Sequence, residues 1–322
     1  MGHPLLLMMA GALRLLGFFT DPWLSDRDIH RVVGRPGTTA GAAQATGAAD
    51  ADADALPHVP STRLNIVTWN IEQGMAYDAI LRTLRTLDAD ILLLQEVDRN
   101  CRRTGYRDVA RDLAEALDMN WVAAGEFQEI GEGRGGRPAI TGQAILSRFP
   151  IADARVLRFK AQDRWRWSIN PAQPRRGGRM VLIARSHGLL LYNTHIESGG
   201  KEKLKRAQMA EVLAHQAREA AALATRAETA GPVLIAGDFN NGPLTHSPMF
   251  APLTAAAFTD ALGEATFRGP TSRGGRHPID WIFVKGLTPI SGIGRVVDAQ
   301  AASDHSPVMA ALNAATVVAL GR

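Results

Sequence analysis

At six points in this 322-residue chain, a short apolar segment adjoins polar residues of the kinds that carry catalysis. These are Trp69–Asn70 ending LNIVTWN, Gln95–Glu96 ending DILLLQE, Thr194–His195 ending LLLYNTH, Asp238 and Asn240 in GDFN after VLIAG, Asp280 opening DWIFV, and Asp304–His305 preceding SPVMAAL. A side chain at a strand end can be aimed at a shared cleft while its backbone stays rigid. One such residue alone is more often a cap, turn or surface residue, but the whole set in one chain indicates a functional cleft.

Between these points the chain alternates strand-like and helix-like patterns. The expected helices are Tyr77–Leu87, Tyr106–Leu117 and Lys201–Ala224, the last with Met209, Leu213, Ala217 and Ala220 on its inner stripe. The expected strands are Leu64–Trp69, Ile91–Leu94, Trp121–Phe127, Ala139–Ser147, Met180–Arg185, Leu189–His195, Val233–Ala236, Ile279–Val284 and Ser306–Leu312. This order predicts an α+β or mixed α/β fold. The glycine-rich GEGRGG (131–136) reads as a flexible connection between strands, and no Walker A loop occurs.

The first 60 residues differ in composition from the rest. Leu5–Phe19 would span roughly 22 Å as a helix, less than the roughly 30 Å hydrocarbon core of a membrane, and Arg14 interrupts the segment. We therefore expect no stable membrane span. We expect a cytoplasmic monomer, with export through a signal-like Leu5–Leu13 segment as the alternative. Residues 34–60 read as a disordered Ala/Gly/Asp-rich linker, followed by a single domain over 61–314 and a tail over 315–322.

The motifs WN (69–70), QE (95–96), NTH (193–195), GDFN (237–240), IDWIF (279–283) and SDH (303–305) occur in one order along the chain. In composition and order they resemble the motif series of the endonuclease/exonuclease/phosphatase superfamily, the DNase I-like enzymes. The resemblance covers about Leu64 to Leu312. It implies a four-layer α/β/β/α sandwich of two packed sheets, with the active cleft at one edge.

The resemblance also implies a metal-dependent phosphoester hydrolase. A hard divalent cation, Mg²⁺ or Mn²⁺, would neutralise phosphate oxygens and the leaving group, and it prefers carboxylate oxygen ligands. Glu96 is the first expected ligand, Asn70 would hold the metal or the phosphate beside it, and Asp304 would contribute directly or through water.

The remaining roles follow from the same resemblance. Asp238 would orient or deprotonate the attacking water, and Asn240 would donate a hydrogen bond to the phosphate. His305 would contact a phosphate oxygen or act as the base, with Asp280 fixing its tautomer, and His195 would stabilise charge in the transition state. The sequence leaves open whether Asp238 or His305 accepts the proton.

The substrate is less constrained than the chemistry. The formal charge of +4 suits a phosphate-bearing partner or simply solubility. The segment 160–179 interleaves six basic residues with Trp165 and Trp167, which suits nucleic acid, an anionic membrane, or an edge strand with core tryptophans and solvated arginines. Arg99 or Arg103, close behind Glu96, could also reach a substrate phosphate.

We therefore expect a phosphodiesterase acting on nucleic acid. The alternative is a phosphatase or phosphodiesterase acting on a phospholipid or a small phosphorylated metabolite. A catalytically silent phosphate-binding scaffold is disfavoured because every role in the site is filled. The single cysteine, Cys101, excludes a disulfide framework and a cysteine zinc site.

Overall fold

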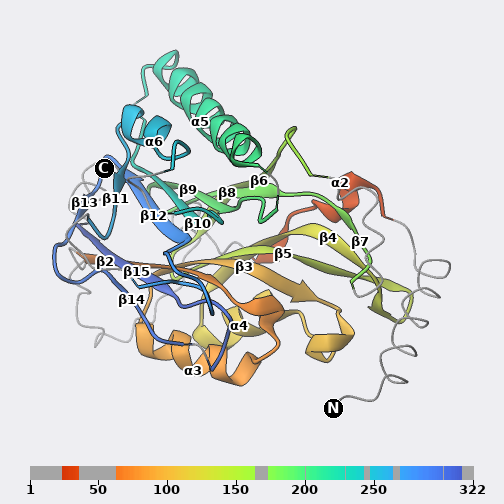
Figure 1. The fold of residues 1–322 in the computed structure, drawn as a ribbon. Coiled ribbons are helices and arrows are strands. Elements are labelled where there is room, and N and C mark those ends of the chain that lie inside the picture. The colour runs from red at the N-terminus through yellow and green to blue at the C-terminus, as the bar shows by residue number, and fades with distance from the viewer. Residues whose placement is uncertain are drawn as a thin grey trace, which may run out of the picture.

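The computed structural model describes residues 24–35, 63–163, 173–199, 201–228, 230–242, 247–263, 269–299 and 301–313. Its strands form two mixed sheets (Figure 1). The first sheet has the order β1-β4-β5-β3-β2-β15-β13, with β14 paired to β15 and β7 to β4. The second has the order β11-β12-β10-β9-β8-β6.

In the first sheet the strands are β1 (Val33–Arg35), β2 (Arg63–Asn70), β3 (Ile91–Arg99), β4 (Asn120–Arg134), β5 (Arg137–Ser147), β7 (Arg175–Gly177), β13 (Thr288–Pro289), β14 (Arg295–Val296) and β15 (Val308–Asn313). In the second they are β6 (Ile151–Arg158), β8 (Met180–Ser186), β9 (Leu189–His195), β10 (Val233–Asp238), β11 (Thr259–Asp260) and β12 (Asp280–Lys285). The helices are α2 (Asp26–Ile29), α3 (Tyr77–Leu87), α4 (Val109–Leu117), α5 (Glu202–Ala224) and α6 (Ala251–Ala255), with 3₁₀ turns η1 (Glu72–Gly74) and η2 (Arg102–Thr104).

Three buried clusters hold four layers together. One lies between the sheets, one joins the first sheet to α3 and α4, and one joins the second sheet to α5 and α6. Figure 1 shows α5 and α6 on the outer side of one sheet and α3 on the outer side of the other. The predicted four-layer DNase I-like sandwich is confirmed.

The two-residue period of a strand decides which cluster each side chain joins. In β2, Leu64 and Ile66 enter the core between the sheets, whereas Val67 and Trp69 pack toward the helices. Both faces are therefore packed, and β2 is buried over most of its length rather than on alternate residues.

The long helix α5 differs from its predicted stripe. Its buried residues are Gln208, Met209, Val212 and Gln216. The Gln208 amide is satisfied locally, because its Oε1 accepts from the Glu197 N–H at 2.9 Å and its Nε2 donates to the Ala161 carbonyl at 2.9 Å. A buried amide is stable here only because both of its ends are hydrogen-bonded.

Residues 24–35, within the segment predicted as leader and linker, are part of this fold: β1 adds to the first sheet at β4. The predicted Leu5–Phe19 segment, most of the linker, the Arg164–Trp167 alternation and the C-terminal tail lie outside the described residues. No helix within the described ranges has the length and apolar character needed to cross a bilayer.

Gly142 of β5 is a point of close backbone approach. A Cβ atom there would lie 2.0 Å from the Ala124 carbonyl oxygen and 2.6 Å from the Gly125 Cα. We expect Gly142→Ala to lower the unfolding free energy by about 2–3 kcal/mol, because backbone atoms must move. Gly269→Ala, with open space around its Cβ, is the matched control and should change it by less than about 0.5 kcal/mol. Urea unfolding measures both changes. Equally small losses of unfolding free energy would show that the backbones of β4 and β5 can move apart at little cost.

Candidate active site

The face between the sheets changes from apolar to polar toward one edge. Leu93 and Leu191 belong to the apolar core between the sheets, and Gln95 and Asn193, two residues further along the same strands, carry amides. Gln95 Nε2 donates to Asn193 Oδ1 at 2.7 Å and to Thr68 Oγ1 at 3.0 Å. This buried layer ties β2, β3 and β9 together beneath the next layer, which holds the predicted catalytic residues.

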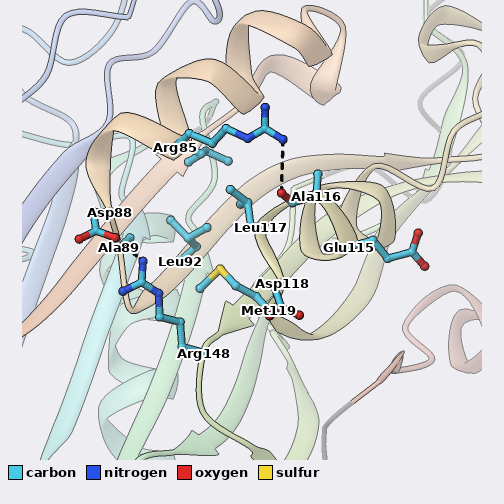
Figure 2. A pocket seen from close by; sticks show the side chains of 11 residues that line it. Arg85, Asp88, Ala89, Leu92, Glu115, Ala116, Leu117, Asp118, Met119 and Arg148 are labelled. Carbon is cyan, nitrogen blue, oxygen red and sulfur yellow. Dashed lines mark hydrogen bonds and ion pairs between the residues drawn. The ribbon is translucent and has the colours of Figure 1, made fainter. Parts of the chain in front are cut away.

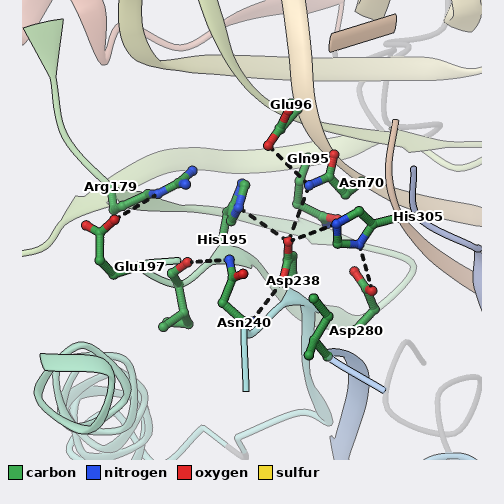
Figure 3. Close-up of polar contacts among 12 residues, drawn as sticks. Asn70, Gln95, Glu96, Arg179, His195, Glu197, Asp238, Asn240, Asp280 and His305 are labelled. Atoms are coloured by element: carbon green, nitrogen blue, oxygen red, sulfur yellow. Dashed lines mark hydrogen bonds and ion pairs between the residues drawn. The ribbon is translucent and has the colours of Figure 1, made fainter. Parts of the chain in front are cut away.

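Asp238 lies at the centre of that outer layer (Figure 3). It pairs in register with His195 on β9 and Asp280 on β12. Its Oδ2 lies 3.3 Å from Asn70 Nδ2, 3.4 Å from His195 Nε2 and 3.8 Å from His305 Nε2. Asn70 comes from the first sheet, so the cluster forms only because the two sheets meet at this edge.

A backbone group near Asp238 fixes the position of its other carboxylate oxygen, Oδ1. The Asn240 N–H donates to Asp238 Oδ1 at 2.8 Å, and Asn240 adopts a left-handed backbone with φ 46°. Asn240 Nδ2 donates to the Ile196 carbonyl at 3.0 Å. Burial first, and then Asp280, raise the pKa of Asp238, although His305 opposes this effect. A buried carboxylate of this kind binds a proton more readily than one in water.

His305 is paired with a carboxylate on its other nitrogen. Its Nδ1 lies 2.9 Å from Asp280 Oδ2, and both residues are buried. Burial alone would lower the pKa of His305, but Asp280 and Asp238 outweigh it and raise that pKa. The imidazole is therefore held as a cation whose Nε2–H faces Asp238.

His195 has the opposite electrostatic environment. Burial, Arg179 and His305 hold its pKa well below 6.5. Its Nδ1 has no hydrogen-bond partner among the described residues and lies 3.8 Å from Glu126 Oε2. That carboxylate accepts from Arg179 Nη1 at 3.0 Å and is fully buried. His195 is thus a neutral imidazole between Asp238 and Glu126.

The pKa of His195 predicts a pH effect on stability. Below about pH 6.5 the unfolded chain takes up a proton at this position and the folded chain does not. The unfolding free energy should therefore fall by up to about 1.4 kcal/mol per pH unit as the pH decreases, and His195→Gln should remove that contribution. Denaturant unfolding of both proteins from about pH 7.5 to about pH 5.5 tests this prediction; parallel profiles would contradict it.

Glu96 leaves the regular ladder of β3. The pairing with β5 shifts register between Gln95 and Val97, and Glu96 has φ 53°. Its Oε1 accepts from Asn70 Nδ2 at 3.3 Å, and its Oε2 accepts from Gln73 Nε2. A bulge commonly re-aims a side chain beside an active site; here it brings the carboxylate to the amide that also contacts Asp238.

Three carboxylates close to Asn70 in the fold suit a hard cation. Burial, then Asp304, and more weakly Glu96, raise the pKa of Glu72, which is the effect of like charges close together. Glu72, Glu96 and Asp304 offer only oxygen donors and are all partly accessible, as Mg²⁺ or Mn²⁺ prefers. Asn70 contributes its N–H groups here, because its Oδ1 accepts from the Glu72 N–H at 3.1 Å.

Among the described residues, one group has its ligand atoms close enough together to hold a metal. Single ligand atoms of Asp238, Asp280 and His305 all lie within 4.8 Å of one another, in a buried position. A metal there would compete with the proton on His305, whose pKa is raised. The oxygens of Glu72, Glu96 and Asp304 do not form such a close group, but they are partly accessible and are the donors that a hard cation prefers.

Arg103 is the predicted site residue that the structure engages elsewhere. Its Nε lies 2.7 Å from Asp98 Oδ2, and its Nη2 lies 2.8 Å from Asp98 Oδ1 and 3.3 Å from Glu129 Oε1. Both carboxylates are buried. Releasing the guanidinium toward a substrate would leave two buried carboxylates short of a partner, which is costly.

Three residues of the site were not predicted from the sequence. Glu72 lies two positions beyond Asn70 in WNIEQG, and Arg179 is one of the basic residues of the 160–179 segment. Glu126 interrupts an apolar strand, which was the available signal for a buried functional carboxylate.

A separate cavity of about 340 Å³ lies between the ends of α3 and α4 (Figure 2). It is lined by apolar residues such as Leu92 and Met119 and by Asp88, Asp118 and Arg148. Leu92 precedes Glu96 by four residues on β3, roughly 13 Å along the strand. The cavity therefore lies near the start of β3, away from Glu96, and its lining contains no histidine.

Comparison with known proteins agrees with the geometry. Residues 67–305 match the Endonuclease/Exonuclease/phosphatase family in sequence. No curated protein matches. An endonuclease/exonuclease/phosphatase from Beutenbergia cavernae DSM 12333 superposes with a TM-score of 0.55 at 21% identity, over 78% of this chain and 71% of that one.

Two other solved structures share the fold. The 2′,3′-cyclic phosphatase ANGEL2, in complex with adenosine-2′,3′-vanadate, has a TM-score of 0.55 at 16% identity, over 78% of this chain and 95% of that one. The mannosyl-6-phosphatase Bt3783 of Bacteroides thetaiotaomicron VPI-5482 has a TM-score of 0.52 at 19% identity, over 77% and 99%.

Proposed function

The chain belongs to the endonuclease/exonuclease/phosphatase family of phosphoester hydrolases, and we propose that it is a phosphodiesterase that cleaves nucleic acid. The proposed reaction depends on a divalent metal and proceeds by attack of water at phosphorus. The observation that carries the proposal is the position of Asp238 Oδ2, within 3.8 Å of groups from Asn70, His195 and His305. The carboxylate of Asp238, the neutral imidazole of His195 and the cationic imidazole of His305 therefore lie together. Hydrolysis of an anionic ester needs such a base and such donors.

Asp238 is the proposed base. Its raised pKa makes it a better proton acceptor than a solvent-exposed aspartate, and Asn70 and the Asn240 N–H keep its oxygens oriented. It takes a proton from the attacking water as the water oxygen bonds to phosphorus.

His305 is proposed as the cationic donor to a phosphate oxygen, because its raised pKa argues against the role of base. Asp280 holds its Nδ1–H and so aims Nε2 at the cluster. His195 is proposed as a neutral donor toward the charge that develops on phosphorus. Asn240 Nδ2 gives one N–H to the Ile196 carbonyl, and its second N–H is proposed to donate to the phosphate.

A bound Mg²⁺ or Mn²⁺ would supply neutralisation of the phosphate and the leaving oxygen. We propose Glu96 and Asp304, with Glu72, as the residues that hold it. Asn70 would then orient Glu96 and Asp238 through its N–H groups rather than act as a metal ligand.

Positive charge around the cluster supports a polyanionic substrate. The start of α5 carries exposed Lys203 and Arg206, and Lys205 Nζ donates to the Asn240 carbonyl at 2.6 Å. On another side, Ser272 bridges to His305, and the exposed Arg276 follows in the same loop. Phosphates next to the scissile one would meet these cations.

A substrate panel tests the proposal. Purified protein with Mg²⁺ should hydrolyse plasmid DNA, an abasic oligonucleotide or RNA, together with bis-p-nitrophenyl phosphate. Sphingomyelin, inositol phosphates and sugar phosphates form the second arm. Turnover of small or lipid phosphates, without turnover of nucleic acid, would replace the nuclease with the phosphatase or phospholipid-directed alternative.

A further inference from the structure

A short segment outside the family match lies along β4, the strand that carries Glu126. Residues 24–35, which we call the strap, comprise α2 and β1, and β1 pairs Val33–Arg35 with Ala123–Trp121 of β4. Ser25 caps α2 by accepting from the Asp28 N–H. Ile29 is fully buried. The strap is therefore fixed to the edge of the first sheet along its length.

His30 connects the strap to one backbone group of β4. Its Nδ1 donates to the Gly125 carbonyl at 2.8 Å, in a buried position. A Cβ atom on Gly125 would lie 2.4 Å from the Ile29 carbonyl oxygen. Only glycine thus allows the strap to sit this close to β4 at that point.

The contacted residue begins a bulge. The pairing of β4 with β5 shifts register between Gly125 and Phe127, so Glu126 is the extra residue. The Glu126 carbonyl accepts from the Gly178 N–H at 2.9 Å. The bulge is therefore held at Gly125 by the strap and at Glu126 by Gly178, which follows β7.

The bulge aims the Glu126 carboxylate at the catalytic layer. That carboxylate accepts from Gln143 Nε2 at 3.0 Å and Arg179 Nη1 at 3.0 Å, and lies 3.8 Å from His195 Nδ1. His195 Nε2 in turn lies 3.4 Å from Asp238 Oδ2. A continuous path of contacts leads from His30 to the proposed base.

We propose that His30, within the strap, is a positioning residue of the active site: it holds the Gly125–Phe127 bulge so that the Glu126 carboxylate stays beside His195 Nδ1. The inference rests on the proposed hydrolase function. It places a segment outside the matched family region among the determinants of catalysis.

The test compares variants within the strap. His30→Ala should lower kcat for bis-p-nitrophenyl phosphate about tenfold with KM within about twofold, because misplacement of a catalytic group affects the chemical step. His30→Asn should restore most of the rate, because its amide nitrogen can donate from nearly the same place as Nδ1. Ser25→Ala, which weakens the cap of α2 but does not touch the bulge, should retain the wild-type kcat.

A double-mutant cycle identifies the route. If His30 acts through Glu126, adding His30→Ala to Glu126→Gln should lower kcat by less than about threefold further. Full additivity, an unchanged kcat in His30→Ala, or an equal loss in Ser25→Ala would each overturn the proposal.

A readout without turnover separates this proposal from the proposed function. The imidazole nitrogen signals of His195 in NMR spectra should shift in His30→Ala and not in Ser25→Ala. If the wild-type protein hydrolyses no diester, the proposed function fails while this shift still supports the positioning role; unmoved His195 signals would overturn the positioning role itself.

Discussion

Replacement of Asp238 by asparagine is expected to lower kcat on the order of 10³-fold while the protein stays folded. Asn can still accept the Asn240 N–H bond, but it cannot take a proton from water. The variant also sets an NH2 group against Asn70 Nδ2 and the His305 cation in place of the Oδ2 oxygen, so the melting temperature should fall modestly. Steady-state kinetics on a diester, with thermal unfolding alongside, measures both effects.

Asp118→Asn is the matched control for this variant. Asp118 ends α4 in a left-handed conformation that asparagine also accepts, and it lines the other cavity. It should keep wild-type kinetics. Wild-type turnover by Asp238→Asn would remove Asp238 from the mechanism, and unfolding of that variant would assign it a structural role instead.

Removal of divalent cations is expected to reduce turnover to background. Burial first, and then the charges of Asp304 and Glu96, raise the pKa of Glu72, and a phosphodiester adds further negative charge. Without a cation this repulsion opposes substrate binding and attack. Dialysis against EDTA followed by titration with Mg²⁺ or Mn²⁺ should abolish and then restore the rate.

The same titration tests which residues hold the cation. Glu96→Gln should need at least about tenfold more Mg²⁺ for half-maximal rate, because it loses a charged ligand. Asp78→Asn, an exposed change on α3, serves as the control and should titrate like the wild type. Undiminished turnover in EDTA would refute the metal-dependent mechanism.

The strand ends could be predicted from the sequence because they depend on residues that are neighbours in the chain. An apolar run such as VLIAG specifies a buried strand, and the polar residue after it, Asp238, must lie where the core ends. The order of the motifs then supplied the four-layer fold through the family resemblance. Within the strands, period-two alternation places Asn193 and His195 on the same face as Leu191.

Features that depend on register could not be predicted in this way. The bulges at Glu96 and Glu126 are shifts of pairing with β5, and no local pattern encodes them. Arg103 was considered for phosphate binding because it follows Glu96 closely, yet tertiary packing pairs it with Asp98 and Glu129. The strap was missed because α2 and β1 are too short to show periodicity.

If this cluster directs water to phosphorus, the oxygen of that water must end on the phosphate, and an isotope label can follow it there. A diester substrate should be hydrolysed by the Mg²⁺-loaded protein in water labelled with heavy oxygen, and the products analysed by mass spectrometry. We expect one labelled oxygen on the phosphate-bearing product and none on the released alcohol. Label in the alcohol, or no hydrolysis of any phosphoester offered, would contradict it.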